Sequence, residues 1–247
     1  MIQNKEELEK EFDLINGEVL LLDKPLTWSS FDVVKKIRYA AKIKKVGHAG
    51  TLDPLATGLL IVCIGKKTKK INDIQDAEKE YTGTIVVGKT TASFDLEHEV
   101  EDVADPNHLT EKDLKEAAES FLGWSDQIPP MYSAVRINGV RAYKHARKGE
   151  VVELKSRKVE LTTFELTRVE LPEVDFRIVC SKGTYIRSIA RDFGEKLGVG
   201  GYLSKLRRER IGEYSVVGAS DPATLADQIR AQVEKAQEEA KKESEDK

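Results

Sequence analysis

The chain has 247 residues, of which 40% are hydrophobic, enough for a substantial core in one large domain or one domain with an appendage. Its first residues contain no apolar segment of a secretion signal, and no run approaches the roughly 18 apolar residues of a membrane span. Two cysteines in apolar runs indicate core thiols, and four scattered histidines show no metal-binding spacing. We therefore expect a cytoplasmic protein with no metal and no membrane contact.

The formal net charge of −3 conceals a strong separation of charge along the chain. Residues 24–70 contain eleven Lys and Arg against two acids, a local charge of +9. Residues 95–119 contain ten acids against two lysines, a local charge of −8. Such separation predicts a basic face, which is typical of proteins that bind nucleic acids.

The first third of the chain predicts a leader, a strand and a helix. Residues 1–16 indicate a short charged helix or an unstructured leader, and residues 18–23 form an apolar run typical of a buried strand. Ser29 or Ser30 can cap a helix whose apolar positions share one face, while its lysines lie on the other.

The loop that follows, residues 47–58, contains three glycines, His48, Asp53 and Pro54, and leads directly into an apolar strand at 59–64. Glycines and an Asp-Pro step exclude a regular helix here. Three interpretations fit the loop alone. It can be a structural turn, a GxxG clamp for a nucleic-acid backbone, or a catalytic loop in which Asp53 is nucleophile or base and His48 handles the substrate.

The remaining chain alternates strands with capped helices. Strands are predicted at 81–88, 151–154, 158–171 and 174–180, with an acidic loop at 93–107 and a hairpin turn at 138–139. Helices are predicted after the Thr110–Asp113 capping box, in the basic stretch that follows the hairpin, and after residues 181–184. A basic cluster at 205–210 precedes a capped, charged tail from residue 220, which we expect to be a solvated helix or unstructured.

Five ordered motifs resemble one family. Residues 47–58 resemble the signature loop of the TruB family, the bacterial tRNA pseudouridine synthases that act on uridine 55. Residues 22–25, 79–81, 128–134 and 181–187 resemble, in the expected order, the family's other motifs, and residues 206–208 resemble the segment after the last one. The resemblance covers about residues 17–214.

The resemblance implies an α/β (α+β) pseudouridine synthase fold with a large, mostly antiparallel mixed sheet, flanked by helices and loops and crossed by an RNA-binding cleft. It implies a leader at 1–16, a catalytic domain at 17–219, and a short charged tail at 220–247 in place of the PUA domain that many members carry. The implied reaction isomerises uridine 55 in the T loop of tRNA without a cofactor. The implied partner is the tRNA T stem-loop, and we expect a monomer.

The resemblance also implies roles for individual residues. Asp53 matches the aspartate that attacks the nucleotide, at either the ribose C1′ or the base C6. Tyr81 matches the tyrosine that stacks on the uracil and can accept the C5 proton, and Arg187 matches the arginine that pairs with the aspartate. The expected substrate-binding residues are His48, which fills the place of the extruded base, Tyr81, Tyr185, Leu206 and Lys24.

One departure from the family pattern concerns the segment after Gly88. The family's Thr-Asp-Thr-type run is replaced here by residues 91–95, so Ala92 stands where an acid is usual, and the role of Asp95 is open. Two alternative functions are kept: a non-catalytic RNA-binding or tRNA-folding module, which would not need Asp53, and a related synthase acting on another RNA.

Overall fold

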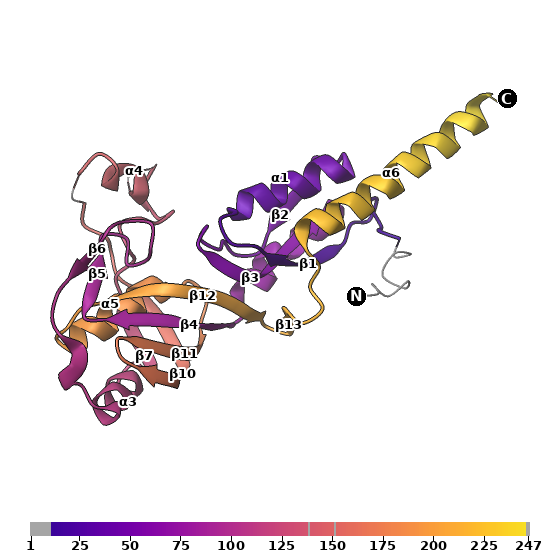
Figure 1. Cartoon of the computed structure of the whole chain (residues 1–247). Helices are drawn as coiled ribbons and strands as arrows, with labels where there is room; N and C mark the ends of the chain where they lie inside the picture. Colours follow the sequence, from indigo (N-terminus) through magenta and orange to yellow (C-terminus); the bar gives the residue numbers. More distant parts are fainter. Residues whose placement is uncertain (1–10, 138, 151, 246–247) are drawn as a thin grey trace. The chain divides into compact units, whose positions relative to one another are not determined.

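The computed structural model describes residues 11–137, 139–150 and 152–245, so most of the predicted leader lies outside the described residues. The chain divides into two compact units (Figure 1). The first unit takes the chain up to Ala77 together with the chain from Arg208 onward, and the second unit comprises Glu78–Arg207. Within the described residues, no helix is long and apolar enough to cross a membrane.

The first unit is built on strand β3 (Ala56–Ile64), which is buried along nearly its whole length. The side chains on both faces of this strand are apolar, so both faces must be buried against other elements. Strands β1 (Val19–Lys24) and β2 (Val46–His48) pair with it antiparallel. Strand β13 (Tyr214–Ser215) pairs with the end of the long strand β12 (Gly201–Ile211), whose last four residues belong to this unit.

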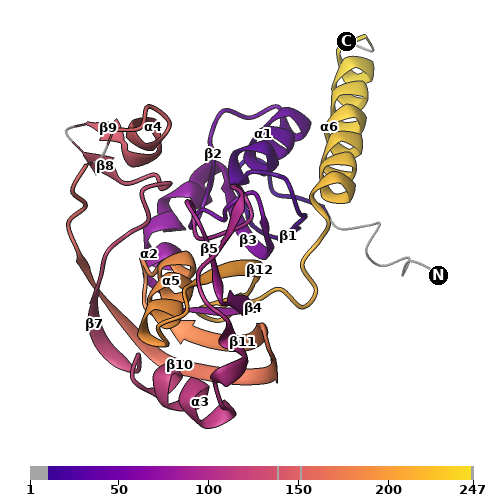
Figure 2. The same cartoon turned by 60° about the vertical axis from the view of Figure 1, so that its left-hand side comes forward.

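Two helices of the first unit pack against each other, α1 (Ser30–Ala41) and α6 (Pro222–Glu245) (Figure 2). Of the two caps considered for α1, Ser29 and Ser30, the cap is Ser29, which forms a capping box with Asp32. The tail is helical, and the apolar side chains of its first half are buried: Leu225, Ala226, Ile229 and Val233. The short helices η2 (Gly65–Lys70) and α2 (Ile71–Asp76) complete the unit.

The second unit contains an antiparallel sheet in the order β4-β11-β10-β7, with the first part of β12 next to β4. These strands are β4 (Lys79–Val87), β11 (Glu173–Cys180), β10 (Arg157–Glu170) and β7 (Gly123–Gln127). The expected mostly antiparallel sheet is thus confirmed. Phe164 on β10 lies at the centre of an aromatic cluster with Phe121, Phe176 and Phe193.

Helices and small hairpins surround this sheet. They are β5 (Lys89–Thr91), β6 (Val100–Asp102), η3 (Pro106–His108), α3 (Glu111–Glu119), β8 (Arg136–Ile137), β9 (Val140–Arg141), α4 (Ala142–Ala146) and α5 (Ile186–Lys196). The capping box of α3 and the β8–β9 hairpin are confirmed. The acidic segment predicted as a loop contains β6 and η3.

The strand predicted at 151–154 is wrong for its described residues, 152–154, which adopt no regular structure. Strand β10 begins only at Arg157, opposite Gln127 at the end of β7. Beyond Gln127 the chain continues into Pro129 and Pro130, which have no N–H to donate to a strand ladder. The ladder therefore ends at Gln127.

Candidate functional site

The predicted catalytic loop of the first unit joins β2 to β3 and is closed by backbone hydrogen bonds. The Ala49 N–H donates to Ile61 O (2.9 Å), and the Ala56 N–H donates to Asp53 O (3.1 Å). Gly50 and Gly58 have φ values of +96° and +98°, where side chains are disfavoured, which explains both glycines. The loop therefore presents Asp53 from a defined backbone path.

Lys24 holds this loop from the end of β1. Its side chain is fully buried, and its ammonium donates to the carbonyl oxygens of Trp28 (2.5 Å), Pro25 (2.9 Å) and Pro54 (3.3 Å). Burial lowers the pKa of Lys24 to about 8, although the charge of Asp53 acts in the opposite direction. With its three N–H groups bound to carbonyls, Lys24 is placed to position the loop, which differs from the expected contact with the substrate.

Two more side chains fix the same loop, and neither role was predicted from the sequence. Arg208 is buried, and it donates from Nε to Leu59 O (2.8 Å) and from Nη2 to Gly50 O (3.0 Å). The Ser30 hydroxyl, in the first turn of α1, accepts from the Leu52 N–H (2.8 Å) and donates to Leu52 O (3.0 Å). Buried side chains therefore hold the loop on both sides of Asp53.

His48, at the end of β2, is an uncharged ring at neutral pH. Burial, and then the positive charge of Arg208, lower the pKa of His48 below its usual value of 6.5. A neutral imidazole can lie in place of an extruded base without placing a second cation in this interior. This environment is compatible with the predicted role of His48 as a stacking group.

In the second unit, the first turn of α5 carries Arg187, whose side chain is only 4% exposed. Its guanidinium donates to Ser93 O (3.1 Å) and Tyr132 O (2.9 Å), and its Nε lies 3.5 Å from Asp95 Oδ2. Arg187 is therefore held in one orientation by two separate chain segments.

Asp95 is the acid whose role the sequence left open, and it is buried against Arg187. Its carboxylate also accepts from the Ser93 hydroxyl (2.5 Å) and the Glu97 N–H (3.0 Å), while the Thr91 hydroxyl donates to Asp95 O (2.6 Å). Asp95 is thus a positioning residue for Arg187. No local pattern marks it, since its partner lies on a helix far along the chain.

The other predicted residues of this unit come from three elements. Tyr81 is buried on β4 opposite Ile178 of β11, and Leu206 is half-buried on β12. Tyr185 precedes α5, where the buried Gln127 side chain accepts from its N–H (2.8 Å) and donates to its carbonyl (3.1 Å). The Arg157 guanidinium lies 4.9 Å from the centre of the Tyr185 ring, a cation–π contact.

The predicted site residues thus fall into two groups, each organised within its own unit. Lys24, His48 and Asp53 belong to the first unit. The second contains Tyr81, Tyr185, Arg187 and Leu206. The pairing of Arg187 with Asp53 stays a prediction. Among the described residues, no group of three or more His, Cys, Asp or Glu could hold a metal ion.

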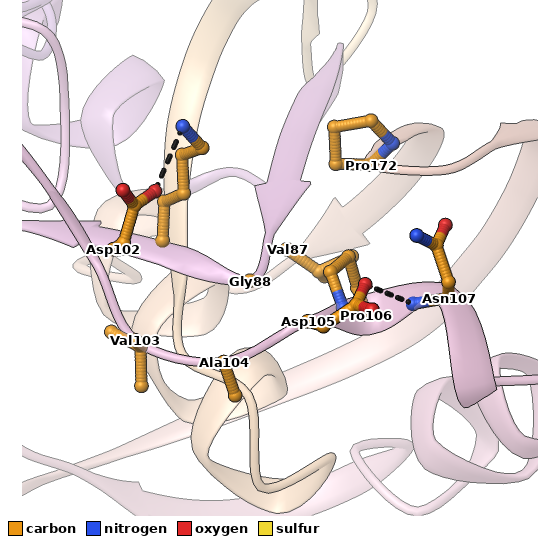
Figure 3. A pocket seen from close by; sticks show the side chains of 10 residues that line it. Val87, Gly88, Asp102, Val103, Ala104, Asp105, Pro106, Asn107 and Pro172 are labelled. Carbon is orange, nitrogen blue, oxygen red and sulfur yellow. Dashed lines mark hydrogen bonds and ion pairs between the residues drawn. The ribbon is translucent and has the colours of Figure 1, made fainter.

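A groove of about 390 Å³ in the second unit is not the candidate active site (Figure 3). It lies at the β4–β5 corner and contains none of the predicted site residues. Its Lys89 ammonium and Asp102 carboxylate pair with each other at 2.9 Å. The Asp105 carboxylate accepts from the Asn107 N–H (3.0 Å), so these polar groups are occupied by one another.

Comparison with known proteins identifies the family of the chain. The model of the TruB family pseudouridylate synthases, N-terminal domain, matches residues 38–186. The tRNA pseudouridine synthase B of Flavobacterium johnsoniae is 52% identical over 216 residues, covering 85% of this chain and 94% of that protein. The protein of the same name from Parabacteroides distasonis is 49% identical over 233 residues, covering 92% and 99%.

Solved structures show the same fold. A chain of an H/ACA RNP bound to a substrate RNA containing 2′-deoxyuridine has a TM-score of 0.63 and 26% identity, covering 85% of this chain and 52% of that one. A chain of a Cbf5-Nop10-Gar1 complex has a TM-score of 0.63 and 30% identity, covering 82% and 50%. This chain thus spans about half the length of those two. The pseudouridine synthase fold is confirmed, and the chain belongs to the TruB family of pseudouridylate synthases, enzymes that isomerise uridine in RNA.

Proposed function

We propose that the chain isomerises uridine 55 in the T loop of tRNA to pseudouridine, with Asp53 as the attacking group. One observation supports this proposal above the others: the loop of residues 47–58 is rigidly held in a chain that belongs to this family. Buried Lys24 and Arg208 fix its backbone, and it presents one carboxylate. A loop fixed in this way can hold a nucleophile in one geometry, which a reaction at a single nucleotide requires.

The reaction is an isomerisation and needs no net addition or loss of atoms. The uridine leaves the helical stack, and Asp53 attacks either the ribose C1′ or the base C6. The N1–C1′ bond breaks, the uracil turns and a C5–C1′ bond forms. The bond to Asp53 breaks in the course of these steps and returns the free carboxylate. The proton on C5 is then lost, with Tyr81 as the proposed base, and N1 gains a proton. Unstacking costs a few kcal/mol, which aromatic side chains that receive the base can offset.

Arg187 is proposed to keep the attacking carboxylate ionised. A carboxylate in a pocket without water would otherwise become protonated, whereas a nearby guanidinium favours the charged form. The proposal is supported by the rigid attachment of Arg187 to Asp95 and to the carbonyls of Ser93 and Tyr132. In this arrangement Asp95 positions the arginine and does not itself touch the nucleotide.

The remaining side chains are proposed to receive the RNA. His48 takes the place of the flipped base, and Tyr185 and Leu206 surround the uracil. Lys24 acts through the loop that it holds. The enzyme is proposed to act as a cytoplasmic monomer on the T stem-loop, where its basic segments contact phosphates.

The direct test is incubation of the protein with an unmodified tRNA transcript, followed by base-resolved mapping of pseudouridine. We expect a single modified position, uridine 55, and no product from a transcript with cytidine at that position. Modification elsewhere in the tRNA would indicate a different target nucleotide. Tight binding of the transcript without any pseudouridine would favour the non-catalytic RNA-binding module instead.

A further inference from the structure

A groove of about 410 Å³ lies along helix α1 in the first unit, away from the face that this helix buries. Its lining residues come from the N-terminal end of α1 and from one side of the helix: Thr27, Trp28, Asp32, Lys35, Lys36 and Tyr39. The helix buries its other side through Val33, Val34, Ile37, Ala40 and Ala41. The groove side chains are therefore not required for the core.

The aromatic side chains on this surface are unusually open to solvent. Of the two aromatic side chains that line the groove, Tyr39 is 70% exposed and Trp28 is half-buried. Phe31, on the same helix but outside the groove lining, is 61% exposed. Burying an aromatic side chain stabilises a protein, and the folded chain leaves that stabilisation unused at Tyr39. Exposed aromatic groups that cluster around a groove indicate a binding surface.

The two lysines of the groove place positive charge on its surface, and the charge of Lys35 also acts on the neighbouring Asp32. Among the described residues, neither Lys35 nor Lys36 forms an ion pair with a carboxylate, and the Lys35 ammonium lies 5.9 Å from the centre of the Tyr39 ring. The one acid of the groove, Asp32, accepts from the N–H (2.9 Å) and hydroxyl (2.6 Å) of Ser29, and these bonds lower the pKa of Asp32. Its carboxylate is thus engaged in capping the helix.

Aromatic faces beside unpaired lysines match one chemical class of ligand. An unpaired nucleotide presents a flat base that stacks on tyrosine or tryptophan and a phosphate that attracts ammonium groups. A neutral peptide would use the aromatic rings but not the charge, and an acidic peptide would use the charge but not the flat faces. The groove therefore favours a nucleotide of an RNA chain.

The groove is attached directly to the predicted catalytic loop of the same unit. The Thr27 N–H donates to Pro54 O (2.9 Å), and Lys24 joins Trp28 O to that same carbonyl. The residue before this proline is Asp53. The wall of the groove and the residue that follows Asp53 are thus joined through one carbonyl group.

We propose that this groove binds a second, unpaired nucleotide of the RNA substrate, separate from the uridine that is isomerised. Its base stacks against Trp28 and Tyr39, and its phosphate lies against Lys35 and Lys36. The proposal rests on the RNA substrate of the proposed function and adds a contact outside the reacting nucleotide.

The test compares three variants with the native chain: Tyr39→Ala, the double variant Lys35→Ala with Lys36→Ala, and Tyr39→Phe. The matched control is Lys241→Ala with Lys242→Ala, which removes two adjacent exposed lysines from the outer part of α6. Affinity for an unmodified tRNA transcript is measured at several salt concentrations, and the rate of pseudouridine formation is measured in single turnover at saturating enzyme. Circular dichroism verifies that each variant is folded.

We expect Tyr39→Ala and the Lys35/Lys36 variant each to weaken tRNA binding by about tenfold, as loss of one stacked base or two phosphate contacts implies. The lysine variant should also flatten the slope of log affinity against log salt, while Tyr39→Phe and the α6 control bind as the native chain does. The saturating single-turnover rate should remain unchanged in all of them. The affinity measurements do not depend on which residue performs the chemistry. The activity of the native chain is measured in parallel, so a failure of the proposed function is seen separately from a failure of the groove to bind RNA.

Native affinity and native salt slope in both groove variants would overturn the proposal. A second contrary result is a native chain that dimerises in sedimentation, a Tyr39→Ala variant that is monomeric, and unchanged tRNA affinity. That pattern would assign the groove to contact between copies of the chain. If the groove variants lost no more affinity than the α6 control, the loss would reflect the overall surface charge of the protein. That result would also contradict a specific binding site in the groove.

Discussion

Both units hold buried cations at the predicted site, but they hold them in different ways. In the first unit, Lys24 and Arg208 donate to backbone carbonyl oxygens, and in doing so they fix the loop that carries Asp53. In the second unit, Arg187 also binds carbonyls, but a buried carboxylate, Asp95, lies beside it. In the first unit, cationic side chains hold the backbone of the loop in place. In the second unit, an anionic side chain helps to hold a cationic side chain in place.

This difference has a consequence for the charge around each group. The carbonyl-bound cations of the first unit keep a net positive charge near Asp53, and the charge of Asp53 acts on the pKa of Lys24. Arg187, in contrast, has an acidic neighbour, Asp95, within its own unit. The two units therefore offer different tests, because a charge pair can be broken and partly repaired by a second substitution, while a cation bound to carbonyls cannot.

The largest effect is expected at Arg187. Replacing it with methionine leaves Asp95 buried without its cation, which should lower the free energy of unfolding by about 3–5 kcal/mol. Adding Asp95→Asn should restore part of that loss, since the uncompensated charge is then removed. Urea unfolding of the two single variants and the double variant gives the coupling. Losses that simply add, within about 0.5 kcal/mol, would show that the two side chains do not interact.

A second cycle, Arg187→Met with Asp53→Ala, examines the predicted pairing between the attacking carboxylate and the arginine. Coupling in this cycle would support that pairing. Strict additivity would contradict it while leaving the Asp95 contact intact.

A smaller loss is expected at Arg208. Arg208→Met removes the donors to two carbonyls in a buried region and should lower the free energy of unfolding by about 2–3 kcal/mol. Unlike the loss at Arg187, it should not be recovered by removing a carboxylate. Arg230→Met, at a half-exposed pair with Asp227, is the control and should change stability by less than about 1 kcal/mol. Equal losses at Arg208 and Arg230 would contradict the assigned role of Arg208 in the loop.

The smallest effect concerns pH and His48. Because burial and Arg208 lower the pKa of His48 in the folded chain, the unfolded chain binds more protons as the pH falls through 6.5. Stability should therefore decrease below that pH, and His48→Gln should show less of this decrease. NMR titration of the imidazole measures the pKa directly. A His48 that titrates at or above 6.5 would contradict the burial and charge assigned to it.

The sequence alone predicted much of the fold, and it did so where a signal is local. The apolar run of β3, the serine cap of α1, the capping box of α3 and the glycine-rich loop are each visible within a dozen residues. The strand predicted at 151–154 failed because the prolines that end its ladder lie in a different segment.

The site was less predictable, since its contacts join distant parts of the chain. Arg208 binds carbonyls 149 and 158 residues away, and no spacing rule relates these positions. The contact of Asp95 with Arg187 is hidden for the same reason. Lys24 was expected to bind substrate from the family resemblance of residues 22–25, and only the folded chain shows that its side chain is fully buried.

The central claim is that Asp53 performs the chemistry while many other residues bind the RNA, and Asp53→Asn tests it most directly. Asparagine keeps the shape but can neither attack nor accept a proton at neutral pH. We expect pseudouridine formation at uridine 55 to fall by several orders of magnitude, while tRNA affinity changes by less than about tenfold, or 1.4 kcal/mol. His48→Ala, which removes a stacking group, should reduce activity only in part. Substantial turnover by Asp53→Asn would contradict the nucleophile assignment, and an equal collapse of binding and activity would show that Asp53 serves the structure of the loop.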